Sequence, residues 1–86
     1  MSTGSIIEEG RSTEAILKDG TFRTIISRTH DAIFEQWLKA ETVEEREVLH
    51  ARYTGMSTLL QTMQSIINDG EIAAADLARE QDTLKP

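Results

Sequence analysis

The sequence predicts an all-α protein: an antiparallel helical hairpin with short flanking helices, packed in a homo-oligomeric bundle. The first observation is an apolar seam at helical spacing, formed by Leu49, Tyr53, Met56, Leu60, Met63 and Ile67. The second is a similar stripe earlier in the chain, formed by Phe22, Ile26, His30, Ile33, Trp37 and Ala40. The third is the connection between them, residues 40–42, which is so short that the two helices must lie antiparallel.

Composition indicates one small folded domain. The chain has 86 residues, of which 38% are hydrophobic and 28% charged, and its net charge is -6. A core of this size is marginal alone, and the absence of cysteine excludes disulfides, which leaves oligomerisation as the main supplement. No apolar run reaches the ~20 residues of a membrane span, and the N-terminus lacks a signal-peptide layout. We therefore expect a cytoplasmic protein without membrane contact, and the acidic balance disfavours nucleic acid as a partner.

The beginning of the chain carries weaker signals. Residues 1–11 contain small polar residues with little periodicity, which predicts a flexible N-terminal arm before a single helical domain over residues 12–82. A first short helix is expected over about residues 13–18, and it would end at the pair Asp19-Gly20. A small β-hairpin across the same pair is the alternative, because short apolar runs do not distinguish the two.

Two longer helices follow, over about residues 21–40 and 43–69. The second begins with a capping box, in which the Thr42 hydroxyl accepts from the third amide and the Glu45 carboxylate accepts from the Thr42 amide. Gly70 is predicted to end this helix, because glycine readily adopts the left-handed conformation of a helix stop.

A last helix is expected over about residues 71–82, before a frayed C-terminus at residues 83–86. The long helix also has an unusual second face, because residues 53–67 carry no charge and Gly55 costs about 1 kcal/mol relative to alanine. Close packing by another helix would explain this face, whereas the alternative is a row of small polar residues facing water. We therefore expect an oligomer interface formed by Gly55, Thr58, Leu59, Thr62, Ser65 and Ile66.

Two charged groups are candidates for binding. An acidic cluster at the hairpin tip, here called the acidic knuckle, is formed by Glu41, Glu44, Glu45 and Glu47. Helix capping and the helix dipole explain part of it, and its functional interpretation is a surface that imitates nucleic acid or one that recruits a basic protein partner. The alternative function is a small-ligand or nucleotide-binding protein with sites between subunits, which would use Arg23, Arg28 and His30.

A metal site and catalysis are the remaining hypotheses. Glu47 and His50 share a helix face, and Glu35 from a facing helix would complete a di-metal carboxylate site. A second Glu-x-x-His is missing, and Leu49 and Tyr53 hold the inward positions, so we expect no metal ligands. Because the chain also lacks a phosphate-binding glycine loop and a Ser-His-Asp set, we predict a protein that is not an enzyme and has no cofactor.

One stretch of the chain carries a family resemblance. Its residues are Phe34, Trp37 and Ala40, followed by Glu45, Arg46, Glu47 and Leu49. This stretch resembles small α-helical accessory proteins of tailed bacteriophages, and with the heptad-like segment after it the resemblance covers roughly half of the chain. It implies a viral accessory or host-takeover role and assigns no site residues. We therefore expect a non-enzymatic interaction or assembly module that acts as a homo-oligomer.

Overall fold

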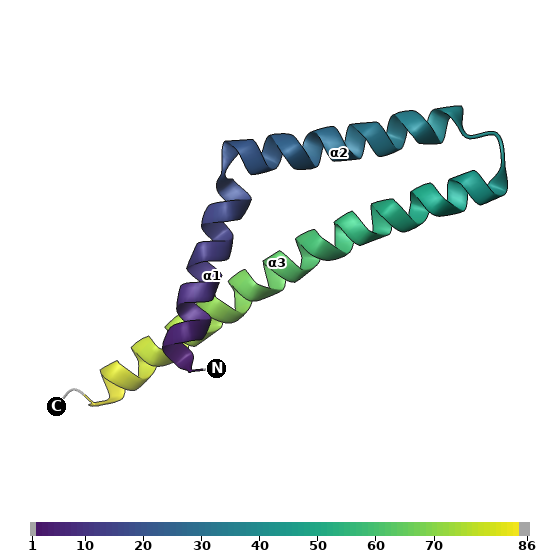
Figure 1. Cartoon of the computed structure of the whole chain (residues 1–86). Helices are drawn as coiled ribbons and strands as arrows, with labels where there is room; N and C mark the ends of the chain where they lie inside the picture. Colours follow the sequence, from purple (N-terminus) through teal and green to yellow (C-terminus); the bar gives the residue numbers. More distant parts are fainter. Residues whose placement is uncertain (1, 85–86) are drawn as a thin grey trace. The chain divides into compact units, whose positions relative to one another are not determined.

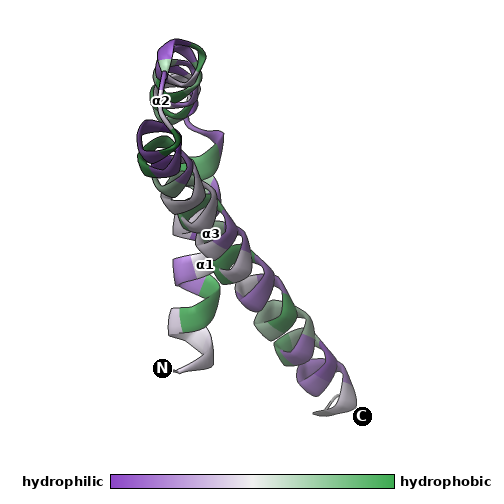
Figure 2. Cartoon of the chain, turned by 90° about the vertical axis from the view of Figure 1, so that its right-hand side faces the viewer, coloured by the Kyte–Doolittle hydropathy of each residue, from purple (hydrophilic) through white to green (hydrophobic). Residues whose placement is uncertain are grey.

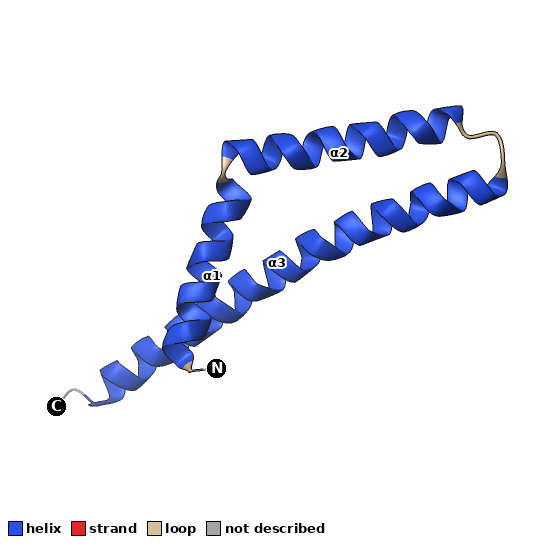
Figure 3. Cartoon of the chain, in the orientation of Figure 1, coloured by secondary structure: helices blue, strands red, loops and turns tan. Residues whose placement is uncertain are grey.

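A computed structural model describes residues 2–84, and these are helical except for Ser2, Asp19 and residues 40–42. The helices are α1, Thr3–Lys18, α2, Gly20–Lys39, and α3, Val43–Leu84 (Figure 1). No strand occurs among the described residues (Figure 3), so the all-α prediction is confirmed and the alternative β-hairpin at Asp19 is wrong. Hydrophobic and hydrophilic residues are interspersed along the helices (Figure 2). No helix in this part of the chain is both long and apolar enough for a membrane span.

Helix α1 takes in most of the segment that was predicted as a flexible arm. Ser2 caps it, because the Ser2 hydroxyl accepts a hydrogen bond from the Ser5 amide at 3.2 Å. Residues 3–11 therefore belong to a helix, and the prediction of an arm is wrong for them, while the first residue of that arm lies outside the described residues. Tertiary packing explains the difference, because α1 buries Ile7 and Gly10.

Asp19 separates α1 from α2, as its sequence context predicts. Its carboxylate accepts a hydrogen bond from the Phe22 amide at 2.9 Å, and its backbone is extended, so Asp19 is the N-cap of α2. At the other end, the Ala40 amide donates to the Trp37 carbonyl at 3.2 Å. Helix α2 therefore lies within one residue of its expected bounds at each end.

The start of α3 keeps half of the predicted capping box. The Glu45 amide donates to the Thr42 hydroxyl at 3.1 Å, as expected. The Glu45 carboxylate accepts from the Glu41 amide at 2.9 Å instead of from the Thr42 amide. The reciprocal contact is therefore displaced by one residue, and it fixes the loop that leads into α3.

The predicted helix stop at Gly70 is wrong. Helix α3 continues through Gly70, so the helices predicted at residues 43–69 and 71–82 form a single helix. Among residues 2–84 no glycine has a positive φ, so Gly70 does not take the left-handed conformation. The predicted frayed end at residues 83–86 lies partly outside the described residues, which place residues 83 and 84 in α3.

Contacts divide the chain into two compact units, where the sequence predicted a single helical domain. Of the described residues, unit 1 contains 2–17 and 62–84, and unit 2 contains 18–61. Helix α3 contributes its C-terminal part to unit 1 and its N-terminal part to unit 2.

In unit 1, two glycines bring α1 and α3 into backbone contact. A Cβ atom built on Gly10 would lie 3.0 Å from the Cα of Gly70, and one built on Gly70 would lie 3.0 Å from the Cα of Gly10. Each would also lie 3.2 Å from a carbonyl oxygen of the facing helix. A Cβ atom at either position would require the facing backbone to shift by a few tenths of an ångström, which explains the preference for glycine at both. The apolar residues buried in this unit are Ile7, Met63 and Ile67.

Unit 2 has a thinner core. Leu49 is 6% exposed and Ala40 is 9% exposed, while Met56 and Leu60 are half-buried. Within α2, which the structure describes in full, no residue is buried. The apolar seam of α3 therefore points inward as predicted except at Tyr53, which is 46% exposed.

Candidate interaction surfaces

Unit 2 exposes most of its large apolar side chains. Leu38 is 69% exposed, in contrast to Leu49 at 6%. The others that are at least 40% exposed are Ile25, Phe34, Trp37, Val43, Val48, Tyr53 and Leu59. Single exposed apolar residues are normal on a protein surface, but a contiguous group indicates an interaction site. Grooves between α2 and α3 are lined by five of these side chains: Ile25, Phe34, Trp37, Val48 and Tyr53.

Two hollows share one side of the helix pair, and we call this side the Arg52 face. One of about 600 Å³ is lined by residues that include Ile25, Arg28 and Gly55. The other, of about 400 Å³, is lined by residues that include Val48 and Glu45. Gln36 and Arg52 line both hollows, so the two hollows adjoin at this pair. The Arg52 face is defined by Ile25, Arg28, Gln36, Glu45, Arg52 and Gly55.

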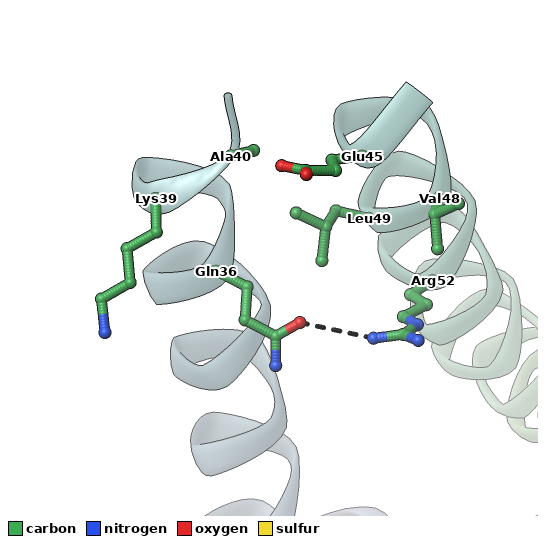
Figure 4. Close-up of a pocket in the computed structure, with 7 residues that line it drawn as sticks. All are labelled: Gln36, Lys39, Ala40, Glu45, Val48, Leu49 and Arg52. Carbon is green, nitrogen blue, oxygen red and sulfur yellow. Dashed lines mark hydrogen bonds between the residues drawn. The ribbon is translucent and has the colours of Figure 1, made fainter. Parts of the chain in front are cut away.

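A hydrogen bond between α2 and α3 marks the centre of this face. Arg52 Nη1 donates to Gln36 Oε1 at 3.3 Å (Figure 4). In the same view Leu49 points into the space between the helices, whereas Lys39 extends away from α3. Lys39 instead donates to Glu35 at 3.3 Å, within α2. The hollow therefore has an apolar floor, with Arg52 at one edge and Glu45 at the other.

The two ends of unit 2 carry opposite charge. Residues 18–30 contain three basic residues and one acidic residue, whereas residues 35–47 contain five acidic and two basic residues. On the Arg52 face Arg28 lies toward the basic end and Arg52 in the middle, while Glu45 lies toward the acidic end in a hollow that Lys39 also lines.

A second groove, here called the aromatic groove, is lined by side chains that include His30, Phe34, Trp37, His50 and Tyr53. It has a volume of about 210 Å³. It gathers both histidines of the chain and three of its four aromatic residues. The rings of His30 and Tyr53 meet edge to face, with their centroids 6.2 Å apart.

The residues predicted as an oligomer interface are accessible. Gly55, Thr58, Leu59, Thr62 and Ser65 are exposed, and Ile66 is half-buried. A Cβ atom built on Gly55 would have no neighbour within 4 Å, in contrast to one built on Gly70. Packing within the chain therefore does not account for a glycine at position 55.

The predicted binding residues are only partly gathered. All four glutamates of the acidic knuckle are exposed, and Glu45 also caps α3. Arg28 lines the Arg52 face, whereas His30 lines the aromatic groove, so one chain does not bring these two together. Arg23 is exposed.

The structure does not assemble the hypothetical di-metal site within one chain. Glu35 forms an ion pair with Lys39 at 3.3 Å, and His50 lines the aromatic groove. Across residues 2–84, no group of three or more His, Asp or Glu side chains is placed to hold a metal ion. The di-metal hypothesis therefore requires ligands from a second chain.

Three features were missed by sequence reasoning: the Gly10–Gly70 crossing, the Gln36–Arg52 hydrogen bond and the aromatic groove. The groove had a partial signal, since His30 and Trp37 lie on the predicted stripe and Tyr53 on the predicted seam. Comparison with protein-family models, curated proteins and solved structures finds no match for this chain.

Proposed function

We propose that this chain is a non-enzymatic interaction or assembly module that acts as a homo-oligomer, with α2 and α3 paired as an antiparallel hairpin in a helical bundle. The observation that carries the proposal is the exposure of α2. This helix buries no residue, although it includes Ile25, Phe34, Trp37 and Leu38. The predicted apolar stripe of α2 is only half-buried at Phe22, Ile26 and Ile33, whereas an amphipathic helix in a monomer normally buries its stripe more completely.

The exposed apolar surface is large enough to drive association. Complete burial of a leucine, isoleucine or phenylalanine side chain contributes about 1.5–3 kcal/mol. Leu38, Phe34 and Ile25 are each more than half exposed, so their burial against a partner supplies several kcal/mol. A second copy of the chain is the simplest partner, since most soluble oligomers are symmetric homo-oligomers.

The oligomer interface predicted from the sequence suggests where on α3 the second copy binds. Gly55 and Leu59 lie on an exposed part of α3, and Gly55 leaves open space where another helix can approach closely. The setting that we propose is the cytoplasm, with a viral accessory role as the phage resemblance implies.

Light scattering behind a sizing column tests the proposal. We expect a discrete oligomer at micromolar concentration and a melting temperature that rises with protein concentration. Leu59→Glu should reduce the oligomer mass, while Gln64→Glu, which adds the same charge at an exposed residue on the opposite side of α3 from Gly55, should leave it unchanged. A monomeric wild-type protein across the concentration range would overturn the proposal.

A second candidate function is binding of a nucleotide or another small aromatic ligand in the aromatic groove. The observation that favours it is the convergence of Trp37, Tyr53 and both histidines, because nucleobases stack on aromatic side chains. Trp37 is the only tryptophan in the chain, so titration with nucleotides should quench its fluorescence saturably. Unchanged emission at millimolar nucleotide would exclude this function.

A further inference from the structure

We infer that a second copy of this chain docks on the Arg52 face in antiparallel orientation, about a twofold axis that passes close to the Gln36–Arg52 hydrogen bond. The inference rests on the proposed self-association and adds to it the face and the direction of the contact. Three features of unit 2 carry it: the charge polarity of the face, the spacing of its charged residues, and the open space at Gly55.

The charge polarity decides the direction. The basic end of unit 2 includes Arg28, and the acidic end includes the whole acidic knuckle, of which Glu45 lines the Arg52 face. An antiparallel pair places the basic end of each copy against the acidic end of the other, twice in each dimer. In a parallel pair the acidic ends of the two copies would meet each other, and so would their basic ends. Such juxtaposition of like charges is unfavourable.

The spacing of the charged residues fits a twofold axis. An α-helix rises 1.5 Å per residue. Arg28 precedes Gln36 by eight residues of α2, which corresponds to about 12 Å. Glu45 precedes Arg52 by seven residues of α3, which corresponds to about 10.5 Å. Gln36 and Arg52 are hydrogen-bonded to each other, so Arg28 and Glu45 lie at similar distances on opposite sides of that bond. A twofold axis there brings Arg28 of each copy opposite Glu45 of the other. It also brings the two Arg52 side chains near each other, so the two Arg28–Glu45 contacts must outweigh that approach of like charges.

The middle of the face is shaped for close contact. Between Arg28 and Glu45 it presents Val48, which is 53% exposed, and Gly55; Ile25, which is 55% exposed, lies just beyond Arg28. A glycine in a helix interior costs about 1 kcal/mol relative to alanine. At Gly70 this cost is explained by contact with Gly10 inside the chain, whereas the space at Gly55 is open. A helix of the second copy is the occupant that accounts for it.

Charge reversal at Arg28 tests the inference. Arg28→Glu converts both attractive contacts of the dimer into repulsive ones, so sedimentation equilibrium should show association at least tenfold weaker than in the wild type. Arg23→Glu is the matched control, because it makes the same charge change in α2 at a residue that lies outside the Arg52 face. Circular dichroism should show unchanged helicity in both variants.

Mixing two variants tests the direction of pairing. Arg28→Glu and Glu45→Lys should each associate weakly alone, and an equimolar mixture should form a heterodimer, since both contacts are then attractive again. Wild-type association that persists in Arg28→Glu, or a mixture that fails to associate, would overturn the antiparallel contact while leaving self-association in place. A monomeric wild-type protein would instead overturn the proposed function itself.

Discussion

The contact between Gly10 and Gly70 predicts that the same substitution, glycine to alanine, changes the stability of the protein differently at two positions of α3. Gly70→Ala adds a methyl group whose carbon would lie 3.0 Å from the Cα of Gly10, so the two helices of unit 1 must move apart. Gly55→Ala adds the same methyl group in open space. Both positions lie inside α3, so the gain in helix propensity, about 1 kcal/mol, is common to both.

The comparison of the two variants therefore isolates the cost of the steric overlap. Overpacking of a tight contact typically costs about 1–3 kcal/mol. At a protein concentration where the chain is monomeric, we expect Gly55→Ala to stabilise the protein by about 1 kcal/mol, and Gly70→Ala to range from neutral to about 2 kcal/mol destabilising. Gly10→Ala should resemble Gly70→Ala, because the overlap is reciprocal.

Urea and thermal unfolding followed by circular dichroism measure the difference. For a chain of this length, 1 kcal/mol shifts the melting temperature by roughly 4–8 °C. Gly70→Ala that stabilises as much as Gly55→Ala would refute the close crossing in unit 1. The measurement should be repeated at two protein concentrations, since a concentration-dependent loss in Gly55→Ala would report a second copy packed at that residue.

Other substitutions test the capping and core contacts by the same unfolding assay. Asp19→Ala should lower the free energy of unfolding by about 1 kcal/mol, because it removes the acceptor for the Phe22 amide. An unchanged free energy of unfolding would contradict the assignment of Asp19 as an N-cap. Thr42→Ala should cost about 0.5–2 kcal/mol by the same reasoning at α3. Leu49→Ala should lower the free energy of unfolding by about 2–5 kcal/mol, because it truncates a side chain in the core. Leu38→Ala is the control, since Leu38 is 69% exposed. Equal losses for the two variants in monomeric protein would contradict the assigned packing.

The balance between the two units has a consequence for self-association. In unit 1 the glycine crossing lets α1 and α3 contact along their backbones, and three large apolar side chains are buried there. In unit 2 the contacts between α2 and α3 include a hydrogen bond and an aromatic pair, both formed by exposed side chains. The apolar side chains of unit 2 are therefore available to a partner, as the proposed function requires.

Local signals in the sequence determined most of the secondary structure. The start of α3, the break at Asp19 and the inward seam through Leu49 follow from side chains within a few residues of one another. Such features depend on capping bonds and on helical periodicity, which neighbouring residues set by themselves. The sequence also identified the uncharged face around Gly55 as unusual, whereas its exposure within one chain came from the structure.

Only the tertiary structure shows that Gly10 and Gly70 allow a close helix crossing and do not end a helix. A glycine without a side chain permits a left-handed helix stop and also permits close helix crossing, so its sequence context alone favours neither. The facing backbone of α1 determines that α3 continues through Gly70, and the same contact holds Gly10 in a helix. Likewise, Gln36 and Arg52 are sixteen residues apart in the chain, and their hydrogen bond forms because the packing of two helices brings them together.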